Sequence, residues 1–115
     1  MKQNIVKEKS FKFAVEIVNL YKELAYNQKE YVMSKQLLKS GTSIGANIRE
    51  ADFAQSKLDF INKMSISLKE ANETIYWLDL LFETKFIDKK TFDNYKPKSE
   101  EMIKLLVSIV KSAKE

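Results

Sequence analysis

The chain has 115 residues, of which 44% are hydrophobic and 31% are charged, and its formal net charge is +4 at pH 7. These values are ordinary for one globular domain with a single core. The absence of cysteine and histidine excludes disulfides, the usual zinc sites, cysteine nucleophiles and histidine bases. No apolar run approaches the roughly 20 residues of a membrane span, and no apolar signal core follows the first lysines. We therefore expect a cytoplasmic protein without a cofactor and without a membrane partner.

Residues 1–9 are polar and are predicted to form an N-terminal arm, followed by a helix over about residues 10–26. This helix carries an apolar stripe at helical spacing, made of Phe13, Ile17, Leu20 and Leu24. Asn27 is expected to end the helix and to cap the next one, because Glu30 lies three residues further on, as in a capping box. A tight hairpin of two helices follows.

A second helix is predicted over about residues 28–53, and it contains both glycines and the only arginine of the chain. Gly41 and Gly45 are four residues apart and share one face. Because glycine costs a helix roughly 1 kcal/mol, we expect another backbone to approach closely there. Arg49 and Glu50 are expected to point away from the core. The residues predicted to serve helix packing and assembly in this segment are Ser40, Gly41, Ile44, Gly45, Asn47 and Ile48.

A third helix is predicted over about residues 57–84, capped by Ser56 with Asp59 three residues on. Its heptad stripe is the most regular in the chain: Ile61, Met64, Leu68, Ala71, Ile75, Leu78 and Phe82. The opposite face also carries apolar side chains, namely Ile66, Trp77, Leu80 and Leu81, interrupted by Glu70 and Glu73. A helix that is apolar on two faces is covered on two sides, here by a thicker bundle or by another subunit. We expect self-association through Glu70, Glu73, Trp77 and Leu81.

Asp88 is predicted to cap a fourth helix over about residues 89–113. Pro97 falls inside this helix, where it removes one backbone hydrogen bond and clashes with the preceding turn. We expect either a kink near residues 93–96, or a short helix and a restart capped by Ser99. Four helices with short links predict an all-α, antiparallel, up-down-up-down four-helix bundle formed by one domain, residues 1–115. The turn at residues 85–90 is expected to lie beside the Asn27 hairpin.

Positive charge gathers in two segments: residues 1–12 and residues 85–98 each carry a net +3, whereas residues 50–84 carry a net −4. This pattern is consistent either with solubility alone or with a surface that faces phosphates. The residues that we predict to contact nucleic acid are Lys7, Lys9, Lys12, Lys39, Arg49, Lys85, Lys89 and Lys90.

Other chemistry has weaker support. Glu70 and Glu73, with Glu50 and Asp52, could suggest a carboxylate metal site, but di-iron bundles add histidines, and solvated or ion-paired carboxylates are the simpler interpretation. Ser40, Thr42 and Ser43 have no histidine base, and hydroxyls inside helices usually bond to the preceding turn. The phosphate-binding patterns GxxxxGK[ST] and GxGxxG are absent. We predict neither catalytic nor metal-binding residues.

The segments QLLKSGTSIGANIREAD and KLDFINKMSISLKEANETIYWLDLL resemble the bacterial four helix bundle protein family, first noticed as products of intervening sequences in large-subunit ribosomal RNA genes. The resemblance covers about residues 11–110. It implies an up-and-down bundle assembled as a ring-like homopentamer. A related member, the accessory variability determinant of diversity-generating retroelements, binds nucleic acid and partners a reverse transcriptase.

Two hypotheses follow. The first is a non-catalytic, oligomeric bundle that binds RNA or DNA through its lysine-rich surfaces. The second is a homo-oligomeric scaffold that binds another protein and has no role with nucleic acid. A salt-sensitive complex with RNA distinguishes the two, because phosphate contacts weaken as salt rises.

Overall fold

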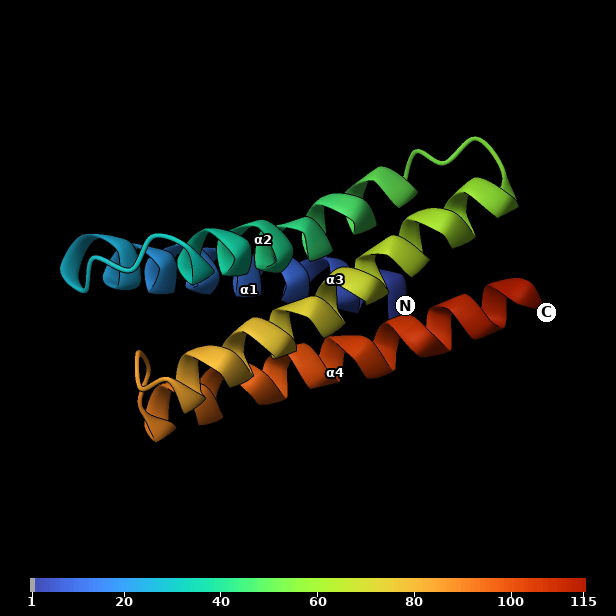
Figure 1. Cartoon of the computed structure of the whole chain (residues 1–115). Coiled ribbons are helices and arrows are strands. Elements are labelled where there is room, and N and C mark those ends of the chain that lie inside the picture. Colours follow the sequence, from blue (N-terminus) through green and yellow to red (C-terminus); the bar gives the residue numbers. More distant parts are fainter. Residues whose placement is uncertain (1) are drawn as a thin grey trace.

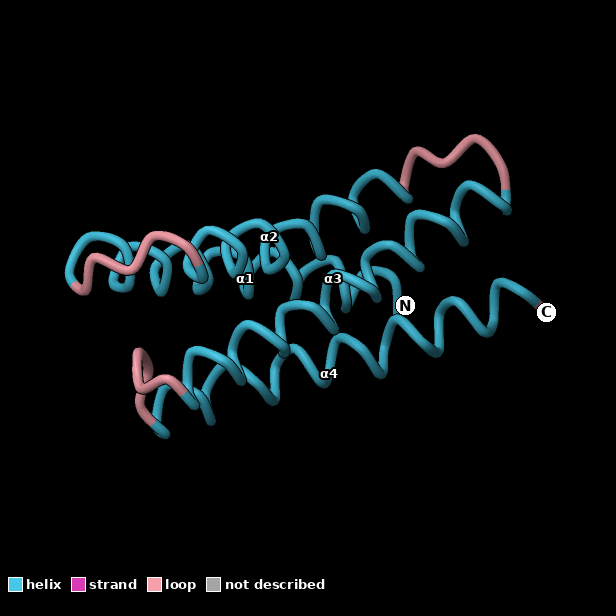
Figure 2. Tube along the Cα trace, viewed as in Figure 1, coloured by secondary structure: helices cyan, strands magenta, loops and turns pink. Residues whose placement is uncertain are grey.

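The computed structural model describes residues 2–115 as four long helices and one short π-helical turn. The elements are α1 (Lys2–Lys22), the π-helical turn η1 (Glu23–Asn27), α2 (Met33–Ala51), α3 (Lys57–Glu83) and α4 (Lys89–Lys114). Successive helices run in opposite directions along a body of 45 × 21 × 19 Å (Figure 1). Short loops join them at the two ends of the bundle (Figure 2). The predicted all-α four-helix bundle is confirmed.

The core is formed by the stripes that the sequence places at helical spacing. Phe13, Ile17, Leu20 and Leu24 are all buried, and the same holds for Leu37, Ile44, Ile48 and Ala51 of α2. The amphipathic pattern therefore accounts for most of the packing of α1 and α2. A separate observation is that no helix among residues 2–115 combines the length and the apolar character needed to cross a bilayer.

The stripe of α3 differs from the predicted one at every second position. Met64, Ala71 and Leu78 are fully buried as expected, but the buried residues that alternate with them are Ser67, Thr74 and Leu81. The predicted Leu68, Ile75 and Phe82 are only half-buried. The prediction that Leu81 lies on a second, outward face is therefore wrong. The buried seam is turned toward α2, where small side chains let the two helices approach closely.

The N-terminal arm predicted over residues 1–9 is wrong for residues 2–9, which form the first two turns of α1; Met1 lies outside the described residues. Val6 is fully buried in the core, in register with Ser10 and Phe13. The segment also contains neither glycine nor proline, so nothing in its backbone opposes a helix. A buried valine at the correct spacing docks this polar segment, and the ion pairs of Lys7 with Asp52 and of Lys9 with Glu101 join it to other parts of the chain.

The hairpin between α1 and α2 is longer than predicted, and its cap is a different residue. α2 begins at Met33, not near Gln28, and Lys29 takes the left-handed conformation (φ 60°) in the hairpin. The Glu30 carboxylate accepts hydrogen bonds from the backbone N–H groups of Val32, Met33 and Ser34. Glu30 therefore satisfies the free N–H groups at the start of α2. The Asn27 side chain instead contacts Glu23.

Replacing Glu30 by alanine is expected to lower the free energy of unfolding by about 1 kcal/mol, the usual cost of removing a helix cap. Asn27→Ala is the matched control and is expected to have an effect below about 0.5 kcal/mol, because its side chain caps no helix. Urea denaturation followed by circular dichroism measures both. If Asn27→Ala lowered the free energy of unfolding more than Glu30→Ala does, Asn27 would be the cap of α2 after all.

The other two caps follow the sequence. The Ser56 hydroxyl accepts a hydrogen bond from the Asp59 N–H at 3.0 Å, and Asp88 accepts one from the Thr91 N–H at 2.8 Å. α4 continues through Pro97 as one helix, so the predicted break and restart is wrong. Ser99 caps nothing; it is buried, and its hydroxyl donates to the Ala71 carbonyl of α3 at 2.9 Å. The kink near residues 93–96 remains a prediction.

Candidate assembly and nucleic-acid interfaces

Gly41 and Gly45 both face α1. A methyl group on Gly41 would lie 2.9 Å from two side-chain carbons of Ile17, closer than carbon atoms pack. On Gly45 it would lie 3.2 Å from the Ser10 hydroxyl and 3.4 Å from the Ser10 carbonyl oxygen. The close approach at the glycines is confirmed, and the element that approaches is α1 of the same chain. The backbone expected there comes close at Gly45 through Ser10, whereas at Gly41 the close atoms belong to the Ile17 side chain.

Small polar residues fill the seams of α3 with α2 and α4. The Ser67 hydroxyl donates to the Ile44 carbonyl of α2 at 2.8 Å, and the Thr74 hydroxyl lies 3.0 Å from the Ser40 hydroxyl. No side-chain nitrogen or oxygen that is buried in residues 2–115 lacks a hydrogen-bond partner. A packing role was predicted for Ser40 but not for Ser67 and Thr74. The available signal was that these two residues alternate with Met64, Ala71 and Leu78 at spacings of three and four residues along α3.

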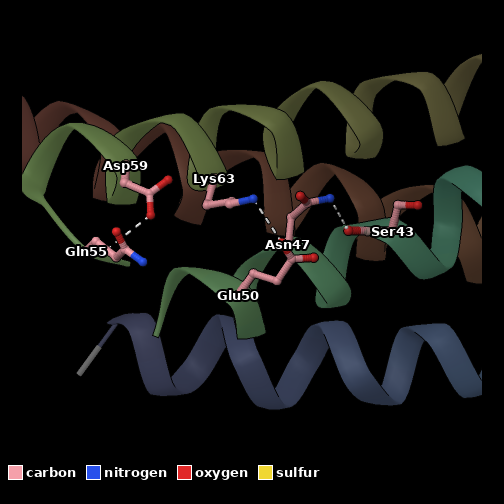
Figure 3. A network of polar contacts seen from close by, with 6 residues as sticks. All are labelled: Ser43, Asn47, Glu50, Gln55, Asp59 and Lys63. Carbon is pink, nitrogen blue, oxygen red and sulfur yellow. Dashed lines mark hydrogen bonds and ion pairs between the residues drawn. The ribbon is translucent and has the colours of Figure 1, made fainter. Parts of the chain in front are cut away.

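The hydroxyls and the amide on the outer side of α2 bond to their own helix. Thr42 and Ser43 donate to the carbonyls of Leu38 and Lys39 at 2.7 and 2.6 Å. Asn47, which was predicted to serve helix packing and assembly, donates to the Ser43 carbonyl at 2.8 Å (Figure 3). Such bonds to the preceding turn are the usual state of helical hydroxyls, and they hold these side chains along the helix.

The four carboxylates that could have suggested a metal site lie in separate contacts. Glu50 pairs with Lys63 of α3 at 2.9 Å (Figure 3), and Asp52 pairs with Lys7 of α1. Glu70 and Glu73 lie on the outer side of α3. Residues 2–115 contain no cluster of three or more acidic side chains with the geometry to hold a metal ion.

The eight residues predicted to contact nucleic acid fall into two groups. Four are in ion pairs: Lys7 with Asp52, Lys9 with Glu101, Lys12 with Glu8, and Lys89 with Asp93. The other four have no carboxylate within 4 Å among the described residues: Lys39, Arg49, Lys85 and Lys90. Exposed ion pairs are weak and exchange with solvent, so the first four lysines are less available to a phosphate but not blocked.

Lysines and tyrosines gather at one end of the bundle. We call residues 22–35 and 85–91 the lysine–tyrosine end. The Gln28 side chain of the first segment donates to the Phe86 carbonyl of the second at 3.0 Å, so the turn lies beside the hairpin as predicted. The two segments carry a net charge of +3. Tyr26 and Tyr31 are 60% and 51% exposed. Sequence analysis did not assign Lys22, Lys29 or Lys35 to this surface.

Two of the three carboxylates of the lysine–tyrosine end accept hydrogen bonds from backbone N–H groups, and the third, Glu23, accepts one from the Asn27 side chain. Glu30 caps α2, and Asp88 caps α4. The backbone N–H of Thr91 lowers the pKa of the Asp88 carboxyl below its usual value. Because Glu30 and Asp88 face helix N-termini, Glu23 is the one carboxylate of this end that caps no helix. It stands against six lysines, of which Lys89 pairs with Asp93.

The outer face of α3 keeps exposed apolar surface after folding. Ile66 is 42% and Tyr76 57% exposed. Trp77 is half-buried, and its indole N–H donates to the Glu73 carboxylate at 3.3 Å. Burial, followed by the nearby charge of Glu73, raises the pKa of the Glu70 carboxyl. This face therefore combines exposed aromatic surface with two carboxylates that no lysine or arginine of the described residues approaches within 4 Å.

Comparison with known proteins agrees with this architecture. No curated protein matches the chain. A solved structure of a protein of unknown function from the S23 ribosomal protein family of Bacteroides thetaiotaomicron is 62% identical. The similarity covers 96% of this chain and 99% of that one, with a TM-score of 0.95. Residues 2–108 match the family described as 23S rRNA-intervening sequence protein. The chain therefore belongs to the 23S rRNA-intervening sequence protein family.

Proposed function

We propose that the protein is a non-catalytic, self-assembling four-helix bundle of the cytoplasm that binds RNA at its lysine–tyrosine end. The observation that carries the proposal is the arrangement of this end: five lysines without an ion partner among the described residues, two exposed tyrosines, and two carboxylates that cap helices. Lysines bind phosphates without sequence preference, and exposed aromatic rings stack on unpaired bases. The family name, which refers to ribosomal RNA, supports RNA as the first ligand to test.

Self-assembly is the second part of the proposal, and the outer face of α3 supports it. Exposed Ile66 and Tyr76 beside Trp77 give an apolar surface on a helix whose other side already faces the core. Copies that repeat one contact around an axis form a closed ring, and the family resemblance favours five copies. A ring of parallel subunits would bring all the lysine–tyrosine ends to one rim.

The RNA part is tested by the salt dependence of binding. Wild-type protein is expected to bind a fluorescent single-stranded RNA and to lose affinity steeply between about 50 and 200 mM salt. Lys29→Glu/Lys85→Glu/Lys90→Glu is expected to reduce the slope of log affinity against log salt by about 2, since each phosphate contact on single strands contributes roughly 0.7. Fluorescence anisotropy measures both values.

The matched control is Lys57→Glu/Lys104→Glu/Lys111→Glu. It makes the same change in net charge at three exposed lysines that also have no ion pair. We expect it to retain most of the wild-type slope. Equal losses in the two variants would assign the binding to net charge alone. Wild-type binding that is absent, or indifferent to salt, would refute the RNA function and leave the scaffold for another protein as the better hypothesis.

A further inference from the structure

The outer face of α3 is matched in chemistry by a groove on the opposite part of the same molecule. The groove lies between α1 and α2 and has a volume of about 260 Å³. Its lining includes the small residues Ala14, Gly45 and Ala46. Small lining residues let a helix on another molecule come close, in the way that ridges pack into grooves.

One wall of this groove is apolar and basic. Phe11 is 59% exposed, and the Arg49 guanidinium lies 6.0 Å from the centre of its ring. Arg49 has no carboxylate within 4 Å among the described residues, whereas Lys7, at the rim, is already paired with Asp52. Val15, exposed on α1 one turn from Phe11, extends the apolar surface. The groove therefore offers apolar area with one free cation.

The outer face of α3 offers the complementary features. Ile66, Tyr76 and Trp77 form apolar area, and Tyr76 packs edge-on against Trp77 with ring centres 4.9 Å apart. Glu70 and Glu73 lie in the same face. Lys69 and Lys39 of the same chain are near enough to lower the pKa of Glu70, but neither forms an ion pair with it. The face therefore offers apolar area with free carboxylates.

We infer that the occupant of the α1–α2 groove is a second copy of this chain, which inserts the outer face of its α3 so that Glu70 and Glu73 reach Arg49. Opposite charges across an interface select the partner and fix its orientation. The two surfaces are different parts of one chain, so the contact is heterologous, and its repetition produces a ring or a filament rather than a two-fold dimer. This inference rests on the self-assembly proposed above and adds the two surfaces that make it.

Charge reversal on either side tests the pairing. The face variant is Glu70→Lys/Glu73→Lys and the groove variant is Ala46→Glu/Arg49→Glu. Each is expected to raise the dissociation constant of the oligomer at least about 100-fold, because like charges replace opposite ones across the contact. Gel filtration with light scattering measures the mass over a range of concentrations. Trp77, the only tryptophan, adds a second readout, since its emission should shift to the blue when the face is covered.

Mixing the two variants separates a heterologous contact from a symmetric one. The wild-type pairing remains between the groove of the face variant and the α3 face of the groove variant. The introduced lysines of the face variant also meet the introduced glutamates of the groove variant, so both contacts are attractive. We expect the mixture to assemble beyond a dimer, with the two variants alternating, whereas a symmetric face-to-face contact would give a 1:1 dimer that grows no further. A single chain carrying all four substitutions should also assemble, because its surfaces are complementary with the charges exchanged. A mixture that stays monomeric or that stops at a dimer would overturn the assignment.

Matched controls change the same net charge elsewhere on the exposed surface. Glu83→Lys/Glu100→Lys corresponds to the face variant, and Lys111→Glu/Ser112→Glu to the groove variant. Both controls should assemble as wild type does, and circular dichroism should give all variants the same helicity. If the wild type assembles and the face and groove variants assemble equally well, the two surfaces are wrongly assigned while self-assembly stands. If the wild type is a monomer at every concentration, self-assembly itself is refuted.

Discussion

Replacing Val6 by aspartate is expected to lower the free energy of unfolding by about 3 kcal/mol at pH 7, because a carboxylate without a partner is then buried. Val6 is fully buried among the core residues of the bundle. Ile5→Asp makes the same charge change one position earlier, where the side chain is 47% exposed. Its expected effect is below about 1 kcal/mol. Urea denaturation at one protein concentration compares the two.

The comparison distinguishes a docked first turn from a free arm. If residues 2–9 were an arm, both variants would unfold at the wild-type urea concentration. If the first turns of α1 opened locally without the rest of the bundle, the loss for Val6→Asp would stop at the free energy of that opening. A large difference between neighbouring positions can come only from a helix with one buried side.

The success of the sequence analysis in α1 and α2 has a simple physical basis. Bulky apolar residues at helical spacing lie on one face, and both helices bury that face against the rest of the chain. Ile17 and Ile44 are completely buried for this reason. The caps at Ser56 and Asp88 were equally predictable, because a short polar side chain before an N-terminus serves the backbone three residues on.

Hydrophobicity alone could not set the rotation of α3. Leu68 and Ile75 are more apolar than Ser67 and Thr74, yet the latter are the fully buried pair. Each hydroxyl is satisfied by a partner, the Ile44 carbonyl for Ser67 and the Glu70 carbonyl for Thr74. Small volume and a satisfied hydroxyl make them suitable for a close seam. The prediction for Leu81 failed because every second position of the buried stripe lies one residue earlier than predicted: Ser67, Thr74 and Leu81 take the places of Leu68, Ile75 and Phe82.

The candidate surfaces were predictable only in part, because they depend on partners that are distant in sequence. Lys7 and Lys9 belong to the basic N-terminal segment, but each meets a carboxylate far along the chain, Asp52 and Glu101. The hydrogen bond from the Gln28 side chain to the Phe86 carbonyl joins residues that are 58 positions apart in the sequence. This bond brings the segments that contain Lys29 and Lys85 together. Composition gives the number of charges, and only the packed bundle gives their neighbours.

The two glycines of α2 are expected to respond to alanine in opposite ways. Alanine favours a helix by roughly 1 kcal/mol over glycine at either position. At Gly41 the new methyl would meet Ile17 at 2.9 Å. Ile17 is fully buried and branched at Cβ, so few rotamers let it move away. Overpacking of this kind costs about 1–3 kcal/mol, so after the gain in helix propensity a net loss of up to about 2 kcal/mol is expected for Gly41→Ala.

At Gly45 the nearest atom is the Ser10 hydroxyl at 3.2 Å, a side-chain atom that can shift by a few tenths of an ångström. Gly45→Ala is therefore expected to be neutral or to stabilise by up to about 0.5 kcal/mol. Thermal unfolding at equal protein concentration measures both variants. Stabilisation by both substitutions would contradict the close contact at Gly41. Destabilisation by both would mean that Ser10 cannot shift to make room for a methyl group at Gly45.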